Sequence, residues 1–422
     1  MYVAELRCSL CGRLYAPDEV PYTCPACGQA GTLDVLYDMD SLRRRVSRED
    51  IARSPDPTLW RYRLLLPLPA DAVVPPLAVG GTPLYDAPRL AADLGLAQAW
   101  IKDDGRNPTG SLKDRASAVV VARAMVQGTK VVTTASTGNA AAALAGVAAS
   151  VGLPAVIFVP ASAPEAKIAQ LLTYGAYVLL VRGNYDNAFD LAVQAAERYG
   201  WYNRNTGMNP YTAEGKKTVA YEIAEQLGWQ APDAVVLSVG DGNIISGVHK
   251  GFSDLLALGW IDRMPRLIGV QADGSAACYQ VWKRGQDPAT MTPIESHTVA
   301  DSIAADLPRD RVRAVRAVRE TNGAFVSVPD EAILEGIPML ARLSGVFAEP
   351  AAAATYAGAR AALAQGVLKP EDHVVLLVTG NGLKDIKSAM RVAGSGYSVA
   401  PDIEEVERAR QVLGLPSFGR SS

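Results

Sequence analysis

Short runs of β-branched and other apolar residues alternate with longer helical patterns along most of this chain of 422 residues. The runs have the length of buried strands, and the segments between them are long enough for helices. Strands that alternate with helices form parallel sheets through crossover connections, and this many predict two sheets or one large one. The predicted class is therefore α/β. The predicted strands are 100–102, 131–134, 156–159, 177–181, 235–239, 267–271 and 374–379, and the predicted helices are 113–127, 140–151, 185–199, 217–227, 247–258, 330–343 and 350–365.

The loops after these strands are rich in glycine, hydroxyl and amide residues. In parallel sheets ligands bind beyond the carboxyl ends of the strands, so a site is expected here. The loops surround one lysine at a predicted helix start, Lys113. Such a set of donors suits an anionic cofactor that accepts many hydrogen bonds. The loops span 103–111, 135–139, 183–185, 240–243 and 380–382.

Common phosphate-binding and hydrolase motifs do not explain these loops. Segment 215–218 resembles the end of a Walker A loop, but Pro210 stands where that loop needs its first glycine. After Gly240 and Gly242 the next glycine is Gly247, so the dinucleotide-binding spacing fails as well. The sequence has no G-x-S-x-G elbow, and its three histidines are far apart. The turn after Gly240 remains as a glycine-rich anion site that opens a helix.

Several short motifs occur in one order between about residues 78 and 390. They are G-T-P-L at 81–84, N-P-T-G-S-L-K-D-R at 107–115, S-T-G-N at 136–139, G-N-Y-D at 183–186, E-G-K-K-T at 214–218, G-D-G-N-I at 240–244 and T-G-N-G-L-K-D at 379–385. In this order they resemble the pyridoxal-phosphate enzymes of the tryptophan-synthase-β type, and within them the threonine synthase family. The resemblance implies two domains, each with a parallel sheet, and the cofactor between them.

The resemblance also implies roles for individual residues. Lys113 is expected to form the Schiff base and to act as catalytic acid and base. Such a lysine needs an amine of lowered pKa, which a helix N-terminus and neighbouring cations favour. Asn139 is expected to bind the phenolic oxygen of the cofactor, and Thr379 to face the pyridine nitrogen. The phosphate of the cofactor is expected on the backbone of Gly240, Asp241, Gly242, Asn243 and Ile244.

The implied substrate is a small amino acid. Ser136, Thr137 and Gly138 are expected to bind its carboxylate, and Lys217 to contribute a cation. The implied reaction converts O-phosphohomoserine and water into threonine and phosphate by γ-elimination and β-addition. The alternatives are a pyridoxal-phosphate-dependent ammonia-lyase acting on serine or threonine, and a β-replacement enzyme acting on an activated serine.

The chain departs from the family pattern near the expected substrate site. Thr212 stands where the family usually has an arginine suited to the phosphate of the substrate, and Ala140 stands where a hydroxyl residue is usual. The turn at 240–243 is also one residue shorter than expected. Loss of a bidentate cation removes both charge and geometry. The nearest cations in sequence that can replace it are Arg204, Lys216 and Lys217.

Four of the five cysteines form two C-x2-C-G knuckles near the N-terminus. Glycine after each pair permits the tight turn that points backbone amides at the thiolates. We expect a closed, structural zinc ribbon whose ligands are Cys8, Cys11, Cys24 and Cys27.

Charge excludes several partners. The chain carries 41 basic and 44 acidic side chains, so no global charge favours nucleic acid or an anionic membrane. Residues 1–40 have two basic and six acidic side chains, a sign that opposes nucleic-acid binding by the ribbon. With no secretion signal or membrane segment expected, the location predicted is the cytoplasm. A homodimer is the expected assembly.

The expected division of the chain follows from these motifs. We expect a zinc-ribbon-like segment at 1–45, a larger cofactor-binding domain from 60–112 and 230–392, a smaller mobile domain at 113–229, and a helical tail at 393–422. Arginines at 311, 313, 316 and 319 alternate with valines at helical spacing. This pattern predicts a helix with a solvated charged face over an apolar stripe.

Overall fold

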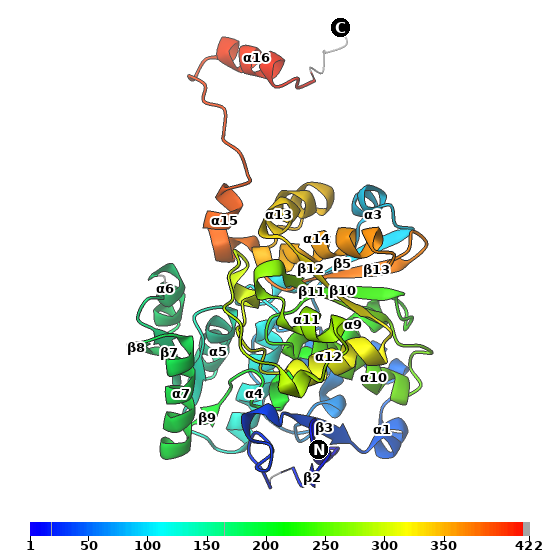
Figure 1. Cartoon of the computed structure of the whole chain (residues 1–422), viewed down its shortest axis with the longest axis vertical. Coiled ribbons are helices and arrows are strands. Elements are labelled where there is room, and N and C mark those ends of the chain that lie inside the picture. The colour runs from blue at the N-terminus through cyan, green and yellow to red at the C-terminus, as the bar shows by residue number, and fades with distance from the viewer. Residues whose placement is uncertain (18, 164, 417–422) are drawn as a thin grey trace.

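Two parallel sheets and one small antiparallel sheet hold the strands of the chain in the computed structural model, which describes residues 1–17, 19–163 and 165–416. The predicted α/β class with two parallel sheets is confirmed. The sheets lie side by side, and the antiparallel sheet packs beneath the larger one (Figure 1). No helix of the described residues is long and apolar enough to cross a membrane.

The larger sheet has six strands in the order β12-β11-β10-β13-β5-β4. All neighbours are parallel except β4, which runs antiparallel to β5 at one edge. The strands are β4 (Leu84–Asp86), β5 (Gln98–Asp103), β10 (Ala234–Ser238), β11 (Arg266–Ala272), β12 (Ala324–Val328) and β13 (His373–Val378).

Helices cover both faces of this sheet, as its nearly continuous apolar strands require. Alternate residues face opposite ways: Val236 packs in one apolar cluster with α13 and α14, whereas Val235 and Leu237 belong to the cluster beneath the sheet. In Figure 1, α13, α14 and α3 lie above the sheet, and α9 to α12 lie below it. These helices are α3 (Pro88–Leu94), α9 (Thr218–Gln226), α10 (Asn243–Ala257), α11 (Ala277–Lys283), α12 (Arg311–Glu320), α13 (Asp330–Ser344) and α14 (Pro350–Ala364).

The smaller sheet has four parallel strands in the order β8-β7-β6-β9, all of which fall within residues 113–229. One apolar cluster joins α7 to β6 and β7, whereas α4 and α5 belong to the central apolar cluster. Its strands are β6 (Val132–Ala135), β7 (Ala155–Pro160), β8 (Tyr177–Val181) and β9 (Tyr202–Asn203). Besides α9, the helices of this segment are α4 (Lys113–Val126), α5 (Asn139–Ser150), α6 (Glu165–Thr173), α7 (Tyr185–Tyr199) and α8 (Tyr211–Lys216).

The two ends of the chain differ in their contacts. The N-terminal antiparallel sheet packs against α12 and the central core, whereas α16 projects from the body on an extended segment (Figure 1). These segments contain β1 (Val3–Cys8), β2 (Leu14–Tyr15), β3 (Leu33–Tyr37), α1 (Met39–Arg45), α2 (Arg48–Ala52), α15 (Ile386–Met390) and α16 (Ile403–Val412). Short 3-10 helices lie in the connections at Gly28–Ala30, Leu59–Leu65, Asp104–Arg106, Asp273–Ser275, Pro288–Thr290, Asp301–Ile303 and Gly382–Asp385.

The expectation of a solvated arginine face on helix α12 is wrong for two of its four arginines, whereas Arg319 is exposed as expected. Arg311 and Arg313 are only 8% and 5% exposed, so they do not form a solvated face. Both oxygens of Asp310 accept hydrogen bonds from Arg313, at 2.6 and 2.8 Å. Two nitrogens of Arg311 donate to backbone carbonyls. Burial is possible because each guanidinium finds acceptors, in part from segments distant in sequence.

Helix α8 crosses α4 at Gly215, which generates the first stability prediction. A Cβ at this position would lie 2.1 Å from the carbonyl oxygen of Arg115. We expect Gly215→Ala to destabilise the protein by about 1–3 kcal/mol, the usual cost of overpacking, and to lower its thermal midpoint. Gly396→Ala is the matched control, because nothing lies within 4 Å of a Cβ there. Equal midpoints for the two variants would contradict this account of the crossing.

Candidate active site

Lys113 is the first residue of α4 and is half-buried. Two contacts fix the loop before it. The backbone N–H of Leu112 donates to the carbonyl of Thr379 at 2.9 Å, and the carboxylate of Asp114 accepts from both the backbone and the hydroxyl of Thr109. The structure therefore brings Lys113 beside Thr379, although 266 positions separate them in the chain.

A buried ion network anchors the first turn of α4. The guanidinium of Arg115, fully buried, donates to both oxygens of Asp104 at 2.6 and 2.8 Å and to both oxygens of Glu222 at 2.5 and 2.8 Å. Lys102 donates to Glu222 at 2.7 Å. Arg115 and Lys102 outweigh the effect of burial and hold the pKa of Glu222 far below its usual value. The network joins the end of β5 to α4 and α9, so the position of Lys113 is set by contacts in the core.

The predicted phosphate turn opens α10. Gly242 has a φ of +87°, and a Cβ there would lie 2.7 Å from the Cβ of Ala314. A Cβ on Gly240 would lie 2.8 Å from the Cα of Ile303. Glycine is therefore required at both positions, and the backbone N–H groups at the start of this 15-residue helix suit an anion.

Glu349 is a residue of the site that the sequence reasoning missed. Its carboxylate, 4% exposed, accepts hydrogen bonds from the side-chain amide of Asn139 at 2.8 and 3.1 Å. A Cβ on Gly380 would lie 2.1 Å from it. Burial lowers the pKa of Lys113, and the negative charge of Glu349 partly opposes that effect. The signal in the sequence was an acidic residue directly before Pro350 at a predicted helix start.

The predicted substrate loop, Ser136 to Gly138, follows β6 and is partly exposed. Asn205 holds the end of that strand, because its side-chain oxygen accepts from the Thr134 hydroxyl at 2.9 Å and from the Ala135 N–H at 2.8 Å. The backbone N–H of Arg204 donates to Thr133. The loop thus lies next to Arg204, one of the three cations predicted to be available.

Arg204 and Lys216 are both fully buried cations. Arg204 donates to the hydroxyls of Thr206 and Ser117, and Lys216 donates to the side-chain oxygen of Asn243 at 2.5 Å. Burial lowers the pKa of Arg204, and burial together with the charges of Arg204 and Lys113 holds the pKa of Lys216 well below its usual value. Three cationic side chains therefore converge beside the phosphate turn.

Lys217 is not among the residues that the structure brings to this site. Its ammonium pairs with Glu214 at 2.6 Å and with Asp254 at 2.9 Å, and it lies 4.0 Å from the centroid of the Tyr37 ring. Tyr37 belongs to the N-terminal sheet and donates to Glu214 at 2.6 Å. Lys217 therefore joins the N-terminal sheet to α8 and α10, with its charge compensated by two carboxylates.

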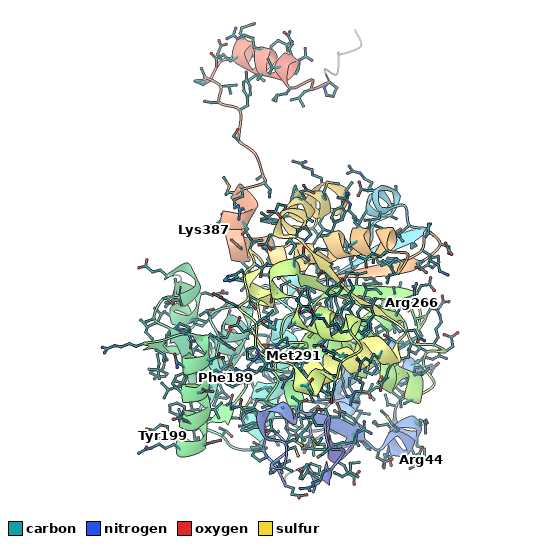
Figure 2. The ribbon with its side chains drawn as sticks, in the orientation of Figure 1. Arg44, Phe189, Tyr199, Arg266, Met291 and Lys387 are labelled. Carbon is teal, nitrogen blue, oxygen red and sulfur yellow. The ribbon has the colours of Figure 1, made fainter. Side chains whose placement is uncertain are left out.

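One side of the site is bridged by α7. Asp186 pairs with Arg309 at 2.8 Å, and the Arg309 guanidinium lies 4.6 Å from the centroid of the Phe189 ring. Figure 2 labels Phe189 on α7, toward the middle of the molecule. The backbone N–H of Arg309 donates to Asp241 in the phosphate turn at 3.3 Å. The two sheet regions are thus in direct contact beside the turn.

The four N-terminal cysteines gather in one cluster. Their Sγ atoms lie within 4.8 Å of one another, and those of Cys11 and Cys24 are 3.8 Å apart. Burial raises the pKa of Cys24, but hydrogen bonds from Tyr15 and backbone amides outweigh burial and lower it to about 6. Gly12 and Gly28 have φ values of +71° and +62°, as the predicted knuckles require. The arrangement is compatible with a small metal site.

The cysteine-rich sheet contacts the cofactor turn through α12. Arg313 donates to the carbonyl of Leu33 at 2.9 Å, and Arg316 donates to both oxygens of Asp34 at 2.8 Å. Arg313 also pairs with Asp310, which accepts from the side-chain amide of Asn243 at 2.8 Å. A continuous polar connection therefore runs from β3 to the phosphate turn.

These residues fit a phosphorylated aldehyde cofactor. Lys113 supplies an amine of lowered pKa, the turn after Gly240 supplies N–H donors for a phosphate, and Thr379 supplies a buried hydroxyl. Residues 76–380 match the family described as pyridoxal-phosphate dependent enzyme. The chain belongs to this class of enzymes.

Similar proteins indicate which family of pyridoxal-phosphate-dependent enzymes the chain belongs to. A threonine synthase from Methanocaldococcus jannaschii is 38% identical over 410 residues, which are 96% of this chain and 99% of that protein. One from Methanosarcina acetivorans is 40% identical over 407 residues, 96% of this chain and 98% of that protein. The chain belongs to the threonine synthase family.

Solved structures share the fold. A threonine deaminase from Solanum lycopersicum has a TM-score of 0.62 at 23% identity and covers 79% of this chain and 92% of its own. A diaminopropionate ammonia lyase from Escherichia coli has a TM-score of 0.64 at 20% identity and covers 80% of this chain and 93% of its own. At these identities the likeness concerns architecture alone, and it agrees with the predicted tryptophan-synthase-β type of fold.

The electrostatic effect of Glu349 on Lys113 generates a prediction about pH. Glu349→Gln removes a charge that stabilises the ammonium form, so the pKa of Lys113 should fall further. The apoprotein binds the cofactor through the neutral amine, so the rate of cofactor binding decreases at low pH, where the amine is protonated. In Glu349→Gln this decrease should occur at lower pH than in the wild type. Stopped-flow absorbance measures this, with the exposed Glu335→Gln as control. An unchanged pH dependence would show that the two groups do not interact.

Proposed function

We propose that the protein converts O-phosphohomoserine and water into threonine and phosphate, with pyridoxal phosphate bound through Lys113. The observation that carries the proposal is the similarity to threonine synthases over almost the whole chain, 38–40% identity across 96% of it. The site supports it, because Leu112, next to Lys113, bonds to Thr379, and Asn139 bonds to Glu349, whose charge acts on Lys113.

The cofactor, when bound, supplies the electron sink for carbanion chemistry. The amine of Lys113, whose pKa is lowered by burial, takes and returns protons at the carbon atoms of the substrate. Ser136, Thr137 and Gly138 bind the substrate carboxylate. Asn139 is held in place by Glu349 and would bind the phenolic oxygen of the cofactor. Backbone N–H groups from Gly240 to Ile244 would hold its phosphate.

The function and its lysine are tested together. Purified protein should release phosphate and form threonine from O-phosphohomoserine, and borohydride should fix the cofactor to the peptide that contains Lys113. Lys113→Ala should lose both the fixation and the activity, because no other amine replaces it at the start of α4. Peptide mass spectrometry and a phosphate assay measure the two outcomes.

The same assay separates the alternatives. If the protein releases ammonia and an oxo acid from serine or threonine and does not react with O-phosphohomoserine, it is an ammonia-lyase. Turnover of an activated serine alone would show a β-replacement enzyme. Either result would overturn the proposed substrate while leaving the class of enzyme unchanged.

We propose further that Cys8, Cys11, Cys24 and Cys27 bind one structural zinc ion. Four thiolates at the zinc–sulfur distance of about 2.3 Å stand about 3.8 Å apart in a tetrahedron. The measured separation of 3.8 Å between two sulfurs, within a cluster that spans 4.8 Å, supports this geometry. A closed set of four protein ligands leaves no position for substrate.

Metal analysis tests the zinc proposal. We expect about one zinc per chain by mass spectrometry of the intact protein, and we expect Cys24→Ser to lose the metal and to lower the thermal midpoint. Cys278→Ala is the control, because Cys278 lies in α11, outside the cluster. Wild-type protein purified without bound metal would contradict the zinc proposal.

We also propose that the protein is a homodimer, that it is located in the cytoplasm, and that residues 113–229 move relative to the larger domain. The resemblance to the family supports the dimer and the movement, and the kinship to biosynthetic enzymes supports the location. Light scattering and comparison of cofactor-bound structures with and without substrate test the assembly and the movement.

A further inference from the structure

Thr212 and Lys216 lie one turn apart on the same face of α8 and meet the same atom. The Thr212 hydroxyl donates to the side-chain oxygen of Asn243 at 3.2 Å, and the Lys216 ammonium donates to it at 2.5 Å. A helix places residues i and i+4 side by side. Lys216 therefore brings its amine to the same side-chain oxygen that the residue at position 212 contacts.

Arg204 approaches the same region from the end of β9. Its Nη2 atom is buried and has no hydrogen-bond partner among the described residues. In the described part of the chain, no carboxylate lies within salt-bridge distance of Arg204 or of Lys216, in contrast to Lys217 and Arg115. Asp241 acts electrostatically on both side chains and Asp310 on Lys216, but neither carboxylate forms an ion pair with them, and their charges do not outweigh the effect of burial on either pKa. Two buried basic groups without a direct ion pair are unfavourable in the core. Such a pair is stabilised when an anion enters.

One anion is already assigned to this region, and it does not need both cations. Backbone N–H groups at the start of α10 suit the phosphate of the cofactor. Lys216 instead lies on the side chain of Asn243, which points from the turn toward α8. A second anionic position, built from side chains, therefore adjoins the first.

We propose that Lys216 and Arg204 bind the phosphate group of the substrate, a phosphoester of a hydroxy amino acid. The assignment rests on the proposed function, because the phosphate is the leaving group of that reaction. Under this proposal Lys216, rather than Lys217, is the lysine that binds the substrate. Lys216 is thereby the residue that determines specificity for phosphorylated over free hydroxy amino acids, with Thr212 as its hydrogen-bonding companion.

Inorganic phosphate tests the position without turnover. In the holoenzyme the cofactor occupies the backbone turn, so added phosphate should bind at the second position and raise the thermal midpoint. Lys216→Met should abolish this rise, whereas Lys216→Arg should keep it. Lys283→Met, an exposed lysine on α11, is the control and should behave as wild type. A rise that persists in Lys216→Met would overturn the assignment.

Kinetics and cofactor binding distinguish the two phosphates. Lys216→Met should reduce kcat/KM for O-phosphohomoserine by about 10- to 150-fold, the loss of one charge-assisted contact. The dissociation constant for pyridoxal phosphate, titrated on the apoprotein, should stay within about twofold. Weakened cofactor binding with unchanged kcat/KM in the reloaded enzyme would place Lys216 at the cofactor phosphate and refute the proposal.

Moving the charge along the helix gives a final test. Adding Thr212→Arg to Lys216→Met should restore both the thermal response to phosphate and part of the lost kcat/KM, because both positions reach Asn243. Failure to restore either would contradict the shared position. Wild-type enzyme that forms no threonine from O-phosphohomoserine would instead refute the proposed function, and the thermal response would still report on the anion position.

Discussion

The pairing of Arg115 with two carboxylates is the interaction on which the site depends. Asp104 directly follows strand β5 of the larger sheet, and Glu222 belongs to α9. The guanidinium of Arg115, on α4, therefore joins three parts of the fold. Removal of one partner from such a buried network typically costs 3–5 kcal/mol. Because Arg115 lies two residues after Lys113, the same contacts that join the elements determine where the amine of Lys113, the proposed Schiff-base group, lies.

Much of this fold follows from sequence periodicity, and the remainder depends on contacts between distant segments. The predicted strand at 177–181 and helix at 185–199 coincide with β8 and α7, because apolar spacing and caps are local signals. Strand β12 was missed although Phe325, Val326 and Val328 are residues typical of a strand. Helix α10 begins at Asn243 rather than 247, because Gly242 caps it in the left-handed conformation.

Site residues within a recognisable motif could be predicted from the sequence. Adjacent residues that face different parts of the fold could not be distinguished in this way. Adjacent residues on a helix point about 100° apart, so Lys216 faces the phosphate turn while Lys217 faces two carboxylates. No pattern in the sequence distinguishes these two lysines. Glu349 was overlooked for a similar reason, because its partner Asn139 lies 210 positions away. Which charged residues lie near a ligand depends on the tertiary structure.

The contact between the cysteine-rich sheet and the phosphate turn implies thermodynamic linkage. Arg313 touches Leu33 on one side, while Asp310 and Asn243 continue the connection on the other. Whatever tightens one end of this chain of contacts favours the geometry at the other, and linkage is reciprocal. If the proposed zinc and the proposed cofactor phosphate bind at these two places, their occupancies are coupled through these contacts. A preparation stripped of one is then expected to bind the other less tightly, although the two sites share no atom.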